Sequence, residues 1–99
     1  MSVHMVQSRV RPERVADVRA AAKKTFAAID AAQPEGIRYA SCLLPDGETF
    51  IALLQIDHGV ENPLPGFPEF RAFLEGVEAS RAEPPNVQPL TVIGSYRLL

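Results

Sequence analysis

The sequence has one cysteine, little net charge and no long apolar run, and each shortage excludes a class of protein. Cys42 has no second cysteine in the chain, so an internal disulfide is impossible. A net charge of −2 does not provide the concentrated basic surface that nucleic acid or an anionic membrane requires, so we expect neither as a partner. No apolar stretch approaches the roughly 18 residues of a membrane span. Residues 1–4 show no signal-peptide pattern, and we expect a cytoplasmic protein.

The residue patterns that mark most cofactor sites are absent as well. His4 and His58 stand at no metal-ligand spacing relative to the scattered acidic residues. The chain has neither a glycine-rich phosphate loop nor a nucleophile elbow around a serine. We therefore expect the protein to need no metal or organic cofactor.

Length and apolar content, by contrast, are sufficient for a packed domain. The chain has 99 residues, of which 46% are hydrophobic, so a buried core is feasible and disorder is not expected. This length is too short for two domains, and we treat residues 1–99 as a single domain.

The clearest local pattern is a β-hairpin over residues 37–57, closed by the turn Pro45-Asp46-Gly47. Proline presets the backbone of a turn, aspartate hydrogen-bonds its own backbone, and glycine accepts positive φ. A three-residue connection predicts that Cys42 pairs with Phe50 across the hairpin. Neither face of the hairpin is polar throughout, and such a sheet is expected to be covered on both sides.

The segments around the hairpin complete a β-α-β-β-α-β order. Alternation predicts strands over Val3–Val10 and Leu90–Leu98. Proline-led first turns and apolar stripes predict helices from about residue 12 to 33 and from about 68 to 82. The order is typical of the ferredoxin-like fold, an α+β architecture in which a four-stranded antiparallel sheet carries both helices on one face.

This architecture leaves the second face of the sheet without a cover from its own helices. The side chains predicted for that face are Cys42, Leu44, Phe50, Leu54 and Ile56, or the alternate set on the same strands. An exposed apolar patch of several hundred Å² marks an interface. We therefore predict a homodimer in which two sheets close face to face into a dimeric α+β barrel.

Four motifs spread over most of the chain carry a family resemblance. They are Val10-Arg11-Pro12-Glu13-Arg14-Val15, Pro34-Glu35-Gly36-Ile37-Arg38-Tyr39, Phe67-Pro68-Glu69-Phe70-Arg71-Ala72-Phe73-Leu74 and Glu83-Pro84-Pro85. In these motifs the chain resembles the antibiotic-biosynthesis monooxygenase family, whose members are dimeric α+β barrels. The resemblance implies that fold and, from the family's enzymes, oxidation of polycyclic aromatic polyketides or quinols without metal or flavin.

A related branch of the family degrades haem, and this sequence departs from its pattern. The positions that match the branch's asparagine and tryptophan hold Val6 and Asp57, and residues 62–67 contain no histidine. The resemblance therefore does not imply haem degradation. A glutamate that is frequent near the end of the family's third strand is matched here by Gln55.

Four residues are candidates for a site near the end of the hairpin. His58 is a candidate catalytic base beside Asp57, and Tyr39 and Gln55 are candidate ligand-binding residues. Each also has a plain structural interpretation. Asp57 and His58 suit an exposed strand end, Tyr39 suits a core position with a hydrated hydroxyl, and backbone groups can satisfy the Gln55 amide.

Two functions remain open on the sequence alone. One is a cofactor-independent monooxygenase that oxidises a small aromatic or quinol substrate in a cleft under the two helices. The other is a non-catalytic dimeric module that binds a small apolar or aromatic ligand or serves as a partner subunit. An open cavity with polar groups at its edge favours the first, and a solidly packed helix–sheet interface favours the second.

Overall fold

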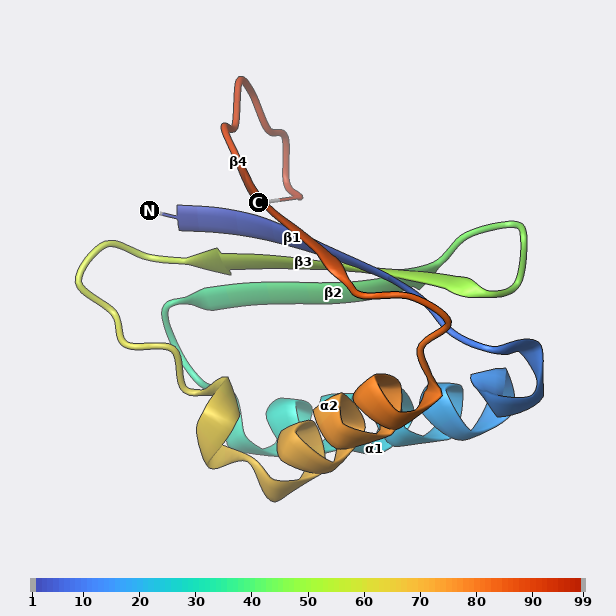
Figure 1. Cartoon of the computed structure of the whole chain (residues 1–99). Coiled ribbons are helices and arrows are strands. Elements are labelled where there is room, and N and C mark those ends of the chain that lie inside the picture. The colour runs from blue at the N-terminus through green and yellow to red at the C-terminus, as the bar shows by residue number, and fades with distance from the viewer. Residues whose placement is uncertain (1, 99) are drawn as a thin grey trace.

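The computed structural model describes residues 2–98, and its helices and strands follow the predicted order. The elements are β1 (Ser2–Arg9), α1 (Val15–Ala32), β2 (Ile37–Leu43), β3 (Thr49–Ile56), α2 (Pro68–Ser80) and β4 (Asn86–Leu90), with short 3-10 turns η1 (Pro12–Arg14) and η2 (Leu64–Gly66). The strands form one antiparallel sheet in the order β2-β3-β1-β4, and both helices lie on the same side of it (Figure 1). The predicted ferredoxin-like fold is confirmed. Residues 1 and 99 of the predicted domain lie outside the described residues.

The sequence of α1 explains both its ends and its buried side. Pro12 opens the preceding 3-10 turn, where its missing N–H is harmless. The helix ends because Gln33 adopts a left-handed conformation (φ 48°) and donates its N–H to the Ile29 carbonyl at 2.8 Å, immediately before Pro34. Val18 is 2% exposed and belongs to the main core cluster. The two helices are joined by the fully buried Thr25, whose hydroxyl lies 3.0 Å from the Ala21 carbonyl and 3.1 Å from the Glu69 carbonyl of α2.

The second helix fixes its position with aromatic side chains. Phe70 and Phe73 are 9% and 5% exposed, and Phe73 packs with Val10, Val18 and Phe50 in the core. Leu74, which the periodicity places on the same stripe, is 49% exposed instead. The buried side of α2 therefore ends between Phe73 and Leu74, at the edge of the helix–sheet interface.

The hairpin register differs by one residue from the prediction. Cys42 pairs with Ile51 rather than Phe50, because the turn contains Glu48 as well as Pro45-Asp46-Gly47. The Asp46 carboxylate stabilises this longer turn. It accepts hydrogen bonds from the backbone N–H groups of Glu48 (2.8 Å) and Thr49 (2.9 Å) and from the Thr49 hydroxyl (2.6 Å). The Thr49 hydroxyl and the two amides also hold the pKa of the Asp46 carboxyl below its usual value.

The corrected register changes which side chains share a face. A one-residue shift moves every side chain of one strand to the opposite face relative to its neighbour. Phe50 and Leu54 face the helices with Tyr39 and Ser41, whereas Cys42 faces away from them. The predicted grouping of Cys42 with Phe50 and Leu54 on one bare face is therefore wrong.

The last strand also differs from the prediction of Leu90–Leu98. It spans Asn86–Leu90, and its last residue lies opposite Val3 of β1. The segment 91–98 has no strand structure and lies on the side of the sheet opposite the helices (Figure 1). Its large side chains are exposed to fractions of 101% for Ile93, 81% for Tyr96 and 71% for Leu98.

The face opposite the helices is mixed but contains an apolar centre. By register it carries Met5 on β1 and Ile51 and Leu53 on β3, all partly buried, next to the exposed Ala40 and Cys42 on the edge strand β2. No helix covers this face in Figure 1. The predicted pairing of two copies across it stays a prediction.

Candidate functional site

An apolar cavity of about 150 Å³ lies between α2 and the sheet. The helix side is formed entirely by apolar side chains: Leu64, Phe70, Phe73, Leu74 and Val77. The sheet side adds four more apolar residues: Val6, Phe50, Ala52 and Leu54. Its polar groups all come from the strands β1 and β2: His4, Ser8, Tyr39 and Ser41. A bound molecule therefore meets hydrocarbon on the helix side and hydrogen-bonding groups only at the flanks of the sheet.

The register of three neighbouring strands arranges these groups in rows across the sheet. Tyr39 on β2, Leu54 on β3 and His4 on β1 form one row. Adjacent strands lie about 4.8 Å apart, so the backbones at Tyr39 and His4 are separated by roughly 10 Å. The next row places Ala52 between Ser41 and Val6. The polar residues Tyr39 and His4 therefore flank Leu54 on opposite sides, one row away from the small side chain of Ala52.

Tyr39 is held firmly between the two helices. Its ring stacks on Phe26 of α1 with centroids 5.1 Å apart and an interplanar angle of 13°. It meets Phe70 of α2 edge-on, with centroids 6.1 Å apart. Burial raises the pKa of Tyr39 to about 12. The phenol is therefore neutral at physiological pH and able to donate its proton in a hydrogen bond.

The raised pKa of Tyr39 predicts a loss of stability at high pH. The unfolded chain ionises this phenol near pH 10 and the folded chain near pH 12, so its contribution is complete below pH 10 and is lost as the pH rises towards 12. A difference of two pKa units corresponds to about 2–3 kcal/mol of unfolding free energy. Urea unfolding followed by circular dichroism between pH 8 and 12 measures it. The Tyr39→Phe variant is expected to lack this component, and parallel curves for the two proteins would contradict the assignment.

The cavity meets solvent between β1 and α2. Among its lining residues, His4 and Leu74 are exposed, whereas the others are buried or partly buried. Val87 of β4 pairs with Val6 and therefore points to the same side of the sheet, where it is 58% exposed. An apolar rim with one histidine thus borders the opening.

The structure separates the four residues predicted from the sequence. Tyr39 lines the cavity, but Gln55, Asp57 and His58 do not. Gln55 is 5% exposed and lies on the opposite face of the sheet, where it pairs with Val3 and Arg38. Asp57 and His58 are exposed in the turn after β3, where the Asp57 N–H donates to the Gly36 carbonyl at 2.8 Å. Their catalytic roles stay predictions.

Sequence reasoning missed His4, Ser8 and Ser41 as members of a site. The signal for the first two was the alternation of the first strand, which sets His4, Val6 and Ser8 on one side. That side faces the helices, a fact that depends on how the strands pair. Among residues 2–98, no three His, Cys, Asp or Glu side chains are grouped as metal ligands, and no helix there is long and apolar enough to cross a membrane.

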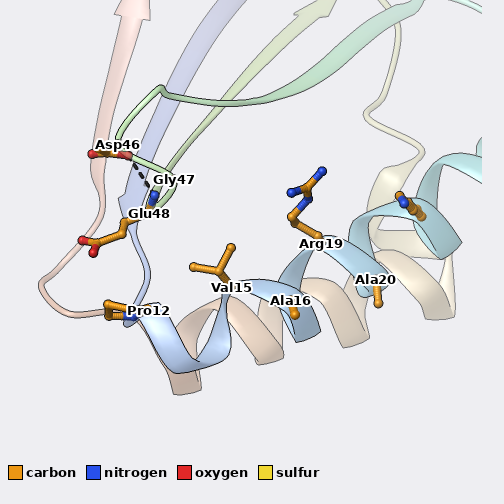
Figure 2. A pocket seen from close by; sticks show the side chains of 9 residues that line it. Pro12, Val15, Ala16, Arg19, Ala20, Asp46, Gly47 and Glu48 are labelled. Atoms are coloured by element: carbon orange, nitrogen blue, oxygen red, sulfur yellow. Dashed lines mark hydrogen bonds between the residues drawn. The ribbon is translucent and has the colours of Figure 1, made fainter.

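A second hollow, of about 640 Å³, lies between the first turns of α1 and the hairpin turn. Figure 2 shows Asp46, Gly47 and Glu48 across from Val15, Ala16 and Arg19, with Asp46 hydrogen-bonded to the backbone of Glu48. This hollow is wide and open, and the Asp46 carboxylate is already engaged by its own turn. The smaller cavity under α2 is therefore the better candidate site.

The fold and the apolar cavity place this chain among ferredoxin-like α+β proteins with a hollow between helix and sheet. No family model matches the sequence, and no curated protein matches it significantly. Among solved structures, a proposed antibiotic biosynthesis monooxygenase from Nitrosomonas europaea superposes with a TM-score of 0.74 at 13% identity, covering 95% of this chain and 100% of that one. One from Caulobacter crescentus has a TM-score of 0.73 at 17% identity, covering 94% and 90%.

A third similar structure is that of SnoaB, a cofactor-independent oxygenase from Streptomyces nogalater. It has a TM-score of 0.68 at 15% identity and covers 97% of this chain and 96% of its own. At these identities the comparisons show the fold, and they confirm at that level the resemblance to antibiotic biosynthesis monooxygenases.

Proposed function

We propose that this protein binds a small aromatic or quinol molecule in the cavity under α2 and oxidises it with O₂, using no metal or flavin. The observation that carries the proposal is the cavity itself, which is apolar on the helix side and has Tyr39 and His4 on opposite flanks of the sheet side. The fold shared with a cofactor-independent oxygenase supports the same chemistry. An apolar site is suited to a flat ring because burying the ring removes its faces from water.

The two flanking residues have complementary roles in this proposal. The neutral Tyr39 phenol donates a hydrogen bond to one ligand oxygen, and the His4 imidazole accepts the proton of a ligand hydroxyl. Deprotonation makes the ring a better electron donor to O₂. For a quinol, two electrons and two protons pass to O₂, which leaves a quinone and hydrogen peroxide.

The proposal is tested by oxygen uptake and quinone absorbance with a monocyclic hydroquinone, corrected for its autoxidation. We expect His4→Ala to lower kcat/KM about 100-fold, as loss of a general base does. Tyr39→Phe is expected to lower it about tenfold, the worth of one hydrogen bond. Lys24→Gln, an exposed change on α1, is the control. If His4→Ala keeps full activity and His58→Ala loses it, the general base is His58, as predicted from the sequence, and not His4.

A non-catalytic ligand-binding module is the second candidate. Tyr39 and His4 are the two titratable side chains in the cavity lining, and the pKa of Tyr39 is too high for it to act as a base near neutral pH. His4 is then the proton acceptor of the cavity, and a site with one such group can bind a ligand without catalysing its oxidation. Ligand binding without oxygen uptake above the autoxidation rate would favour this candidate.

We also propose that two copies form the predicted homodimer through the sheet face opposite the helices. The partly buried Met5, Ile51 and Leu53 on that face support it, as does the segment 91–98 with its exposed apolar side chains. The cytoplasmic location and the absence of a nucleic-acid partner stay predictions.

A further inference from the structure

We infer that Ala52 sets the size of the ligand, so that the cavity takes a single-ring phenol or quinol and excludes molecules of three fused rings. This inference rests on the proposed function insofar as both use the cavity under α2 as the ligand site. It goes further because it names the residue that limits the size of the ligand and the class of ligand, a single-ring phenol or quinol.

The position of Ala52 explains why a cavity exists at all. On the helix-facing side of β3, Ala52 lies between Phe50 and Leu54, two residues away in each direction. Its neighbour across β2 is Ser41, which is also small. The helix residues above are large and do not fill this gap. The hollow is therefore the space that a larger side chain at position 52 would occupy.

The volume limits the ligand to about one ring. An apolar cavity of about 150 Å³ lined by aliphatic and aromatic side chains stays dry and binds a molecule of the size of benzene. The cavity here has the same volume and an equally apolar helix side, and it opens to solvent beside His4 and Leu74. Tyr39 and His4 add polar partners on its two flanks, so a ring that carries a hydroxyl group fits better than a bare hydrocarbon.

The walls around Ala52 have little freedom to retreat. Leu64 is fully buried, and Phe73 is 5% exposed within the core cluster. The helix above is held to α1 where the Thr25 hydroxyl meets the Glu69 carbonyl. Leu74, which is 49% exposed, is the large apolar wall residue at the opening, where His4 is also exposed. A longer molecule would have to project past Leu74 into water, and three fused rings would leave much of their surface unburied.

The experiment measures binding without turnover, by calorimetry under anaerobic conditions. The probes are p-cresol with one ring, 2-naphthol with two and anthrone with three. We expect p-cresol to bind most tightly and anthrone to show no measurable binding. One methylene in an apolar pocket changes affinity about 10- to 200-fold. Ala52→Val is therefore expected to weaken p-cresol binding at least about tenfold, and Ala52→Leu to abolish it.

Two further variants keep the result interpretable. Ala27→Leu makes the same chemical change at an exposed position of α1 and is expected to leave p-cresol binding unchanged. Leu54→Ala enlarges the floor beside Ala52 and is expected to raise the affinity for 2-naphthol about tenfold. Circular dichroism of each variant confirms folding, and Leu54→Ala tests the size rule even if a larger residue at position 52 prevents folding.

Specific outcomes overturn the inference or the proposed function separately. Tighter binding of anthrone than of p-cresol, or p-cresol affinity unchanged in a folded Ala52→Val variant, overturns the inference. Oxygen uptake by a protein that does not bind p-cresol overturns the inference and leaves the proposed oxidation standing. Binding that follows the size rule with no oxygen uptake supports the inference and overturns the oxidation.

Discussion

Phe73→Ala is expected to lower the free energy of unfolding by about 3–5 kcal/mol, the range found when a buried phenylalanine is truncated. Phe73 is 5% exposed and joins α2 to Val10, Val18 and Phe50, residues from three other parts of the chain. The existing cavity already removes packing partners from one side of this ring. Loss of the Phe73 ring would therefore enlarge the existing void, and the cost of a cavity grows with its volume.

Urea unfolding at a fixed protein concentration measures this effect, because an assembling protein gains stability with concentration. The matched control is Leu74→Ala at the next helix position, where the side chain is 49% exposed. We expect it to lower the unfolding free energy by less than about 1.5 kcal/mol, since about half of the Leu74 surface is already in water. Equal losses for the two variants would contradict the placement of the core edge between these residues. The expected loss for Phe73→Ala is a large share of the roughly 5–15 kcal/mol that stabilises a small domain.

The double variant Ile93→Asp, Tyr96→Asp is expected to convert the proposed homodimer into a monomer. Both side chains are exposed, to fractions of 101% and 81%, in a segment whose alternating apolar residues resemble a strand. Residues 91–98 form no strand in the described part of the chain, whereas β2 is an edge strand of the sheet. A second copy can cover the exposed side chains of segment 91–98 and pair with the edge of β2 at the same time. Pairing an open edge also protects a sheet against aggregation.

The size of this effect follows from interface energetics. Truncation of a well-buried apolar or aromatic anchor costs about 2 kcal/mol or more, and a buried charge adds to that cost. Two such losses raise Kd about 1,000-fold, since each 1.4 kcal/mol is tenfold. Sedimentation velocity between 1 and 100 µM detects the change. Ala27→Asp on the exposed side of α1 is the control and is expected to remain a dimer. A monomeric parent protein would contradict the homodimer, and an unchanged dimer in the double variant would exclude segment 91–98 from its interface.

The sequence predicted the elements well because each had a local cause. Pro12 and Pro68 mark the starts of the helical segments, and Gln33 before Pro34 marks the end of α1. Pairing between strands was predicted less well because its causes are not local. The register of β4 sets Leu90 opposite Val3, a residue more than 80 positions earlier in the chain.

The candidate site was predicted only in part for the same reason. Tyr39 was identified because an aromatic ring with a polar tip suits both a core and a ligand. His4 was not, because its neighbours in sequence give no sign that it borders a cavity built by α2 more than 60 residues later. Gln55 was expected to point into the cleft. It lies on the opposite face of the sheet, because the pairing of β3 with β1 and β2 decides which side chains face the helices.

The turn held by Asp46 imposes a parity rule on the length of this hairpin. Removing or adding one residue there would re-pair β2 against β3 one step out of phase, which would bring Arg38 and Ala40 beneath the helices and send Tyr39 to the far side. Changes of two residues would keep each side chain of β2 on its present face of the sheet. Natural variants of this loop are therefore expected to differ in length by even numbers of residues, wherever the aromatic wall of the cavity is retained.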